Sequence, residues 1–274
     1  MASNGELTRG RGAACALALL VALAGCAGAP DPYRERPVEE LYNRAMDQLF
    51  DGQNQIAAKG FEEVERQHPY SVWSRKAQLM AAYSNYLANR YDEAILAAER
   101  YIQLYPGSRD ASYALYLVAI SHYEQIVDVG RDQRVTRQAL TALQQVVDRF
   151  PDSDYARDAR LKIDLTRDHL AGKEMEIGRY YLKRKEYAAA INRFRAVVEQ
   201  FQTTSHVPEA LHRLTEAYLA LGVNDEARTA AAVLGHNFPG SEWYIDSYAL
   251  LTGQNLAPAE AQGSWLSRLW RSVL

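Results

Sequence analysis

The sequence predicts an all-α fold, a superhelical array of about five helix–turn–helix repeats. Four stretches, "HPYS", "YPGS", "FPDS" and "FPGS", share an aromatic or histidine residue, a proline, a variable residue and a serine. Their prolines are Pro69, Pro106, Pro151 and Pro239. Proline cannot continue a helix and serine is a good N-cap, so each stretch is expected to end one helix and to begin the next.

A fixed spacing of small and apolar residues precedes these stretches. A fifth stretch, "FQTT" at 201–204, joins the set with Gln202 at the proline position. Twelve residues before the five proline positions stand Ala57, Ala94, Ala139, Ala190 and Ala227. Eight and five residues before them the sequence is apolar or aromatic, which places one apolar face on a helix. Alanine suits the close approach of two helices, and the whole spacing matches the tetratricopeptide repeat.

The proline positions divide the chain unevenly. They are separated by 37, 45, 51 and 37 residues, whereas a plain repeat has about 34. We assign the extra residues of the third repeat to a polar loop at 128–135, and those of the fourth to one long helix from about 154 to 185. The predicted tetratricopeptide domain covers 38–251, with helix pairs at about 37–51 with 53–68, 73–105, 110–150, 154–201 and 206–238.

The pattern of the first 25 residues indicates a lipoprotein signal peptide. Arg9 and Arg11 precede an uncharged run of about 12 residues at 13–24, which is shorter than the roughly 20 residues of a transmembrane helix. The run ends in Leu23-Ala24-Gly25-Cys26, which resembles a bacterial lipobox. This resemblance implies cleavage before Cys26 and the attachment of diacylglycerol and an N-acyl chain to it. An ordinary signal peptide that happens to end near a cysteine is the alternative.

The two ends of the mature chain differ from the repeats. Residues 26–37 are expected to form a short lipidated tether, and residues 252–263 a second linker. Residues 264–274 predict an amphipathic helix, whose apolar face carries Trp265, Leu266, Leu269, Trp270 and Val273. Such a helix can lie on a membrane interface, in the groove of a partner, or folded back on the last repeat. The sequence leaves these three roles open.

Catalytic patterns are missing from the sequence. No two of the six histidines are four residues apart, and neither HExxH, GxSxG nor a phosphate-binding glycine loop occurs. The two cysteines are Cys15 and Cys26, and cleavage removes the first, so no disulfide is expected. We therefore expect no enzyme activity, no metal site and no cofactor other than the covalent lipid. The net charge of −3 argues against nucleic acid as a partner.

Tyrosines mark a candidate binding surface. The chain has 18 tyrosines but only six phenylalanines. Tyrosine combines apolar area with a hydrogen-bonding tip and loses little side-chain entropy on binding. Repeat arrays present extended faces to peptides, so a peptide groove is expected along the first helices of repeats two and three. The tyrosines at these positions are Tyr83, Tyr86, Tyr113, Tyr116 and Tyr123. Packing of these rings between helices is the alternative.

The lipobox, a mature chain of about 250 residues and five uneven repeats together resemble the BamD family. These are the ComL-type lipoproteins of the outer-membrane β-barrel assembly machinery. The resemblance runs from about Pro37 to Phe238 and is most specific at 167–201. It implies a place on the periplasmic face of the outer membrane of a Gram-negative bacterium. The implied partners are the barrel subunit BamA, other assembly lipoproteins and unfolded outer-membrane protein clients.

The resemblance also implies where the partners bind. The C-terminal repeats would hold the periplasmic domains of BamA, and the N-terminal repeats would receive the C-terminal targeting segments of clients. Arg193 fits the family's Asn-Arg position on the second helix of repeat four, where its guanidinium can pair with a carboxylate. The other candidates for contact with BamA are Asn192, Arg184 and Glu174. Two departures from the family pattern are His68, where tyrosine is common, and Gln202.

An alternative hypothesis assumes the same fold but a different partner. A tetratricopeptide lipoprotein could instead coordinate cell-wall synthesis or pilus assembly. Pilus-type arrays tend to keep a regular period, and the steps of 45 and 51 residues disfavour them. A peptidoglycan-processing enzyme would need a catalytic acid or metal site, for which the sequence offers no candidate.

Overall fold

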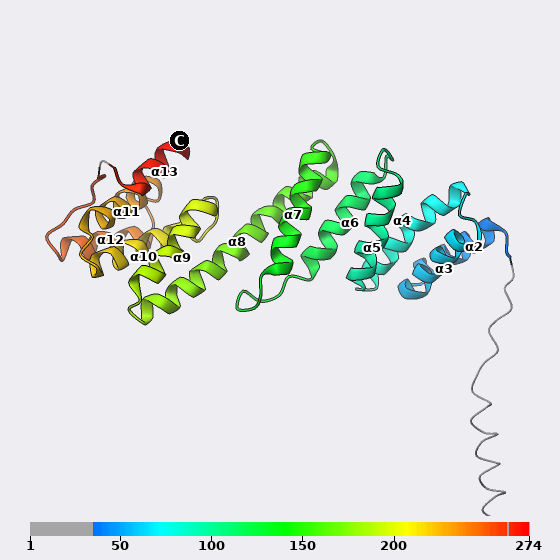
Figure 1. Cartoon of the computed structure of the whole chain (residues 1–274), viewed down its shortest axis with the longest axis horizontal. Coiled ribbons are helices and arrows are strands. Elements are labelled where there is room, and N and C mark those ends of the chain that lie inside the picture. The colour runs from blue at the N-terminus through cyan, green and yellow to red at the C-terminus, as the bar shows by residue number, and fades with distance from the viewer. Residues whose placement is uncertain (1–34, 262, 274) are drawn as a thin grey trace, which may run out of the picture. The chain divides into compact units, whose positions relative to one another are not determined.

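The computed structural model describes residues 35–261 and 263–273, so the signal peptide and Cys26 lie outside the described residues. Within the described ranges the chain forms twelve α-helices and no strand, which confirms the predicted all-α fold (Figure 1). The helices are α2 (Val38–Phe50), α3 (Asn54–Gln67), α4 (Val72–Leu87), α5 (Tyr91–Leu104), α6 (Ala111–Glu124), α7 (Arg134–Arg149), α8 (Asp154–Lys183), α9 (Tyr187–Gln200), α10 (Val207–Ala220), α11 (Asn224–Asn237), α12 (Glu242–Thr252) and α13 (Trp265–Val273).

Small residues let the paired helices approach closely. The five repeat alanines, Ala57, Ala94, Ala139, Ala190 and Ala227, are all 0% exposed. The residues eight and five positions before each proline position are likewise buried, at 1% exposure or less. Each second helix therefore buries one apolar stripe against its neighbours, and this burial is the main source of stability in such an array.

Proline and the residue before it end the second helices. The residues before the four prolines, His68, Tyr105, Phe150 and Phe238, are the C-caps, and each backbone N–H donates to the carbonyl four residues earlier. The serine two residues after the proline begins the next helix in three repeats. The side chains of Ser71, Ser153 and Ser241 accept a hydrogen bond from a backbone N–H of the following helix.

Two repeats begin their first helix differently. In the third, α6 starts only at Ala111, because Ser108 Oγ bonds the Tyr101 hydroxyl at 2.9 Å and accepts from the N–H of Asp110. In the "FQTT" repeat, the Thr204 hydroxyl donates to the carbonyl of Phe201 at 2.8 Å. Helix α10 then begins after His206. In both cases the hydroxyl stabilises the turn instead of capping the helix.

Helix α8 spans 30 residues and joins two cores. Its first half contributes Ala159 and Ile163 to the core formed with α4, α5, α6 and α7. Its second half contributes Ala171 and Met175 to the core that includes α9, α10 and α11. Gly178, near its end, packs directly against the ring of Phe194. A third core holds the first three helices together.

The C-terminal helix folds back onto the last repeats. Leu266 is 1% exposed and belongs to the same core as α9, α10 and α11. The indole Nε1 of Trp265 donates to the Tyr218 hydroxyl at 3.0 Å, and the guanidinium of Arg195 lies 4.3 Å from the centroid of a Trp265 ring. Ser264 Oγ donates to Glu226 at 2.6 Å. Of the three roles left open by the sequence, these contacts favour packing on the last repeat.

A buried histidine holds α12 against α10. His212 is 5% exposed, and its Nδ1 lies 2.9 Å from Ser247 Oγ. Burial lowers its pKa, and the nearby Arg213 lowers it further, while Glu216, Asp246 and Glu209 oppose the shift. The folded protein therefore binds fewer protons than the unfolded chain once the pH falls below the ordinary histidine pKa.

We expect stability to fall as the pH drops from 7 through the depressed pKa of His212. Each proton that only the unfolded chain binds lowers the unfolding free energy by at most about 1.4 kcal/mol per pH unit. His212→Asn keeps a hydrogen-bonding group near the Nδ1 position and cannot titrate, so it should flatten the pH profile of thermal unfolding between pH 7 and 5. Some slope should remain, because burial also lowers the pKa of His122. An unchanged slope in the variant would contradict this account.

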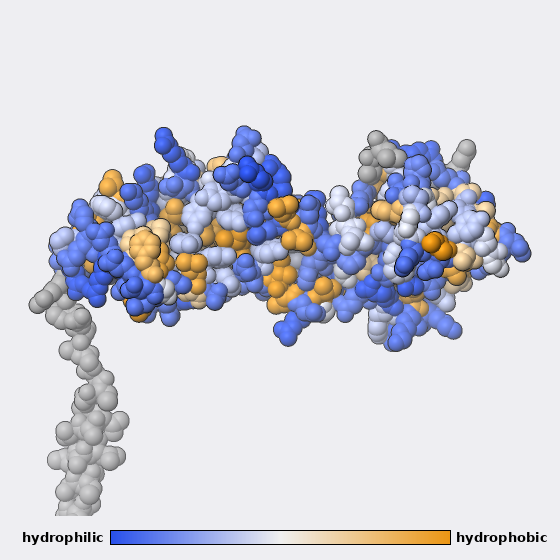
Figure 2. All heavy atoms as spheres, turned by 180° about the vertical axis from the view of Figure 1, so that it is seen from behind, coloured by the Kyte–Doolittle hydropathy of each residue, from blue (hydrophilic) through white to orange (hydrophobic). Residues whose placement is uncertain are grey.

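The surface mixes polar and apolar residues. Figure 2 shows that hydrophobic residues on the face seen there gather in separate patches among hydrophilic ones. None of the helices in the described part of the chain is long and apolar enough to span a membrane.

Candidate functional site

A stripe of tyrosines crosses the first helices α4, α6 and α8. The rings of Tyr83 on α4 and Tyr113 on α6 have centroids 6.3 Å apart. Tyr155 on α8 lies 5.3 Å from Tyr113 and stacks on Tyr116 at 5.2 Å. We call these four residues the tyrosine stripe. All four are partly exposed, so the rings support one another and still face solvent.

One end of the tyrosine stripe is polar. The Tyr116 hydroxyl donates to Asp158, whose Oδ2 lies 3.1 Å from Lys162 Nζ. The Lys162 ammonium lies 5.3 Å from the ring centroid of Tyr123. Partial burial would raise the pKa of Asp158, but the bonds from Tyr116 and Lys162 outweigh it and hold this pKa below its ordinary value. The carboxylate therefore stays charged at neutral pH.

The tyrosines predicted from the sequence divide into two groups. Tyr83, Tyr113 and Tyr116 belong to the tyrosine stripe, and Tyr123 lies at its polar end. Tyr86 instead pairs with the ring of Tyr91 at 5.9 Å. Burial raises the pKa of Tyr86, Tyr113 and Tyr116, so their hydroxyls stay protonated and can donate hydrogen bonds.

Three residues of this surface were not predicted from the sequence, and all lie on α8: Tyr155, Asp158 and Lys162. A signal for the first was present. An aromatic residue stands two positions after the capping serine in "SVW", "SDY" and "SEW", and Tyr155 is the second of these. The pairing of Asp158 with Lys162 has no such signal, because carboxylate and lysine four residues apart are common on any exposed helix.

A second surface lies where α8 meets α9. Arg193 Nη1 donates to Glu174 Oε2 at 3.0 Å, so the structure brings these two predicted residues together. The Arg193 side chain is 44% exposed, and Asn192 beside it is exposed. A guanidinium has five N–H donors, and the bond to Glu174 engages Nη1. A partner carboxylate can therefore still bind Arg193.

Arg184 belongs to a separate cluster at the α8–α9 turn. Its Nε donates to Glu186 at 2.8 Å, and its Nη1 donates to the Tyr180 hydroxyl at 3.1 Å. The guanidinium also lies 5.4 Å from the Tyr180 ring centroid. Arg193 is thus joined with Glu174 and Arg184 has other partners, so the four predicted residues do not form one cluster.

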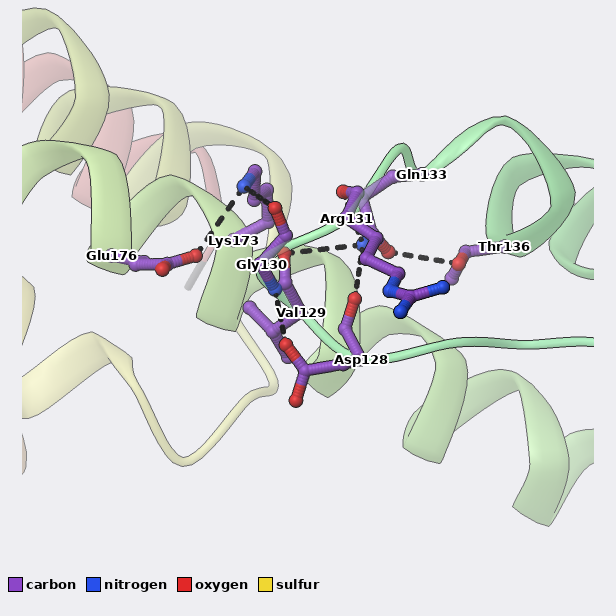
Figure 3. Close-up of polar contacts among 8 residues, drawn as sticks. All are labelled: Asp128, Val129, Gly130, Arg131, Gln133, Thr136, Lys173 and Glu176. Atoms are coloured by element: carbon purple, nitrogen blue, oxygen red, sulfur yellow. Dashed lines mark hydrogen bonds and ion pairs between the residues drawn. The ribbon is translucent and has the colours of Figure 1, made fainter.

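The loop between α6 and α7 rests on α8 at Lys173, next to Glu174 of the second surface. The side-chain amide of Gln133 donates to three backbone carbonyls of the loop, and its Oε1 accepts from Thr136 at 2.8 Å. Asp128 Oδ1 accepts from the N–H of Gly130, and Lys173 Nζ donates to the Gly130 carbonyl at 3.0 Å (Figure 3). The loop is therefore ordered by its own side chains and fastened to α8.

A cleft beside this loop shows no metal-binding chemistry. It has a volume of about 420 Å³, and His169, Asp168, His206 and Arg179 are among its lining residues. Asp168 already accepts hydrogen bonds from the backbone and hydroxyl of Ser205. Across residues 35–261 and 263–273, no group of three or more His, Cys, Asp or Glu is arranged to hold a metal ion.

Comparison with known proteins gives the family. The model of a family described as "YfiO: Outer membrane lipoprotein" matches residues 34–234. The chain belongs to this family. A protein of Caulobacter vibrioides named outer membrane protein assembly factor BamD is 57% identical over 93% of this chain and 85% of its own length. A protein of the same name in Rickettsia prowazekii is 46% identical over 78% of this chain and 86% of its own length.

The YfiO family match confirms the resemblance to BamD proteins that the sequence indicated. It ends at residue 234, so helices α12 and α13 lie beyond it. Among solved structures, one described as "TPR2AB-domain:pHSP90-complex of yeast Sti1" has a TM-score of 0.40 and 11% identity. It covers 79% of this chain and 84% of its own.

Proposed function

We propose that this protein is a lipid-anchored, non-catalytic scaffold of the outer-membrane protein assembly machinery. Its YfiO family membership and the assembly-factor names of its relatives support this role. The observation that carries the proposal is that α8 bears two separate surfaces, the tyrosine stripe near its start and the Arg193–Glu174 pair near its end. One helix thus presents a client surface and a partner surface on the same scaffold.

The anchor is the lipid on Cys26. Diacylglycerol on the thiol and an N-acyl chain on the new amine hold the protein at the periplasmic face of the outer membrane, because two acyl chains suffice for stable anchoring. The lipobox-like sequence before Cys26 supports this assignment.

The tyrosine stripe receives the C-terminal segment of unfolded outer-membrane proteins, which ends in an aromatic residue. Aromatic side chains of the client can pack on the exposed parts of the rings, since edge-to-face and offset stacks stabilise such contacts. The protonated hydroxyls and the Asp158–Lys162 pair supply hydrogen bonds for the peptide backbone. This surface suits an extended peptide better than a folded domain.

Removal of one ring should weaken client binding. We expect Tyr155→Ala to lower the affinity for a fluorescent ten-residue peptide ending in phenylalanine by about 5- to 10-fold, because an aromatic pair contributes roughly 1 kcal/mol. Fluorescence polarisation measures the affinity, and thermal unfolding verifies that the variant is folded. Tyr180→Ala, at an exposed ring outside the stripe, is the control. Equal affinities of the two variants would contradict the assignment.

The Arg193–Glu174 face holds the periplasmic domains of a BamA-type subunit. Arg193 is half exposed and its guanidinium can bind a partner carboxylate, so it can serve as the central anchor of an interface. Asn192 beside it adds a neutral hydrogen-bonding group at the surface.

Charge reversal at this position should abolish the complex. Arg193→Glu removes the cation and places a second carboxylate next to Glu174, so we expect recovery of the barrel subunit to fall more than about tenfold. A gentle detergent pull-down followed by mass spectrometry measures recovery. Arg157→Glu, at an exposed ion pair on the same helix, is the matched control. If Arg193→Glu recovers the barrel subunit as well as the control does, the assignment is wrong.

A further inference from the structure

Helix α12 has the position of the first helix of a further repeat, but no second helix of that repeat follows it. It follows the "FPGS" stretch, and Ser241 caps it as Ser71 and Ser153 cap α4 and α8. In the earlier repeats a second helix follows each first helix. Here the chain leaves the helix at Gly253, and the next helix, α13, packs against α11, with Leu266 in the core and Trp265 bonded to Tyr218 of α10. One face of α12 is therefore left without its usual neighbour.

The residues on this open face are apolar or uncharged. Four, seven and eleven positions after the capping serine stand Ile245, Tyr248 and Thr252, which share one side of a helix. All three are exposed, Ile245 at 64% and Tyr248 at 48%. In α4 the last two positions are Gln78 and Ala82, which are both buried. The first of the three positions, Arg75 in α4, is exposed as well, so the missing second helix accounts for the exposure of Tyr248 and Thr252, whereas Ile245 stands out by being apolar at an exposed position.

Helix α8 provides an internal control for this comparison. The positions seven and eleven after the capping serine are uncovered in α8 as well. Its second helix, α9, packs against the far half of α8, where Phe194 meets Gly178. In α8 the three positions four, seven and eleven after the serine are charged and exposed: Arg157, Arg160 and Asp164. A face that stays in water has charged residues, whereas the face of α12 has the residues of a covered one.

The charged residues of α12 itself have one sign. Glu242 and Asp246 are exposed on the same helix, and α12 contains no lysine or arginine. Two copies of this chain that met face to face would bring these carboxylates together, which like-charge repulsion opposes. Anionic lipid headgroups are disfavoured for the same reason. The edge-to-face contact of Tyr248 with Tyr244, 6.3 Å between centroids, orients the Tyr248 ring.

We propose that the open face of α12 binds an amphipathic helix of a partner protein, with an apolar stripe and flanking lysines or arginines. This helix takes the place of the missing second helix of a sixth repeat, with Ile245 and Tyr248 as its apolar anchors. The flanking cations pair with Glu242 and Asp246. The surface is separate from the tyrosine stripe and from Arg193, so it adds a third partner site to the proposed scaffold.

Site-specific photo-crosslinking tests the proposal in the full-length protein. A benzophenone amino acid replaces Tyr248 in cells of the source bacterium, and mass spectrometry identifies the crosslinked segment. The same amino acid at Arg160 on α8 is the matched control, an uncovered position with the same spacing from its serine. We expect a crosslink from position 248 to a segment with apolar residues at helical spacing and lysine or arginine beside them, in at least fivefold higher yield than at 160.

Charge reversal on α12 tests whether the acidic side chains contribute to binding. Glu242→Lys combined with Asp246→Lys should reduce the crosslink from position 248 at least fivefold, and leave thermal stability unchanged because both side chains are exposed. Arg157→Glu on α8 should leave the crosslink unchanged. The proposal is overturned by a crosslink to a second copy of this chain, to lipid alone or to a segment without basic residues. It is equally overturned by equal yields at 248 and 160, or by no crosslink at all.

Discussion

Truncation of the chain after Gly253 should destabilise the folded protein by about 3–6 kcal/mol. The deletion removes Leu266, which is fully buried, together with two partly buried tryptophans, and burying one large apolar side chain contributes about 1.5–3 kcal/mol. It also removes the hydrogen bond from the Trp265 indole to the Tyr218 hydroxyl on the last repeat. Thermal unfolding followed by circular dichroism should show the C-terminal repeats melting roughly 10 °C earlier.

The truncation also separates the roles that the sequence left open for this segment. Leu266→Ala in the full-length chain should reproduce a large part of the loss, about 2–5 kcal/mol, since it leaves a cavity in the same core. Arg271→Ala, at an exposed position on α13, should change the stability by less than about 0.5 kcal/mol. If the truncated protein melts like the full-length one, α13 does not pack on the repeats, and contact with the membrane or with a partner becomes the better account; unchanged complex yield as well would leave only the membrane.

The substitution Gly178→Ala should destabilise the protein by about 2 kcal/mol, although alanine is the better helix former. In a helix interior, alanine is favoured over glycine by roughly 1 kcal/mol. Here an added Cβ would lie 2.4 Å from Phe194 Cε1 and 2.8 Å from two further ring atoms. The ring is 0% exposed and cannot move away cheaply. Overpacking costs about 1–3 kcal/mol or more, so the clash outweighs the gain in helix propensity.

A second glycine on the same helix provides the control. An added Cβ at Gly172 would meet the end of the His206 side chain at 3.2 Å, and that side chain is partly exposed and able to shift. Gly172→Ala should therefore be neutral or slightly stabilising. Denaturant unfolding of both variants measures the difference. The double variant Gly178→Ala, Phe194→Leu should lose less than the sum of its single changes. Equal stability of Gly178→Ala and Gly172→Ala would show that the contact with Phe194 is not tight.

The repeat pattern is predictable because it depends on local and nearly periodic contacts. Each alanine twelve residues before a proline position is buried against a neighbouring helix, and each proline marks a helix end, so sequence spacing maps directly onto structure. The helix starts that depart from this pattern also have a physical cause. Ser108 does not cap α6 because the Tyr101 hydroxyl binds it, and that contact depends on side-chain packing at the turn.

The candidate surfaces were predictable only in part. Tyr113 and Tyr116 could be placed on a first helix from the repeat register, but their partner Tyr155 lies on another helix about 40 residues later. The pairing of Arg193 with Glu174 likewise depends on how α9 packs on α8. The separation of Arg184 from that pair arises because the turn between the helices places it beside Tyr180 and Glu186.

The sequence by itself determined the helical class and the family, because proline, alanine and apolar spacing act within one helix pair. Only the tertiary structure decided which side chains meet across helices. It placed α13 on the last repeat, where Trp265 reaches Tyr218, and it left Ile245 and Tyr248 of α12 uncovered. The physical reason is that periodicity identifies which face of a helix is apolar, whereas the element that covers this face is chosen by packing between segments distant in the chain.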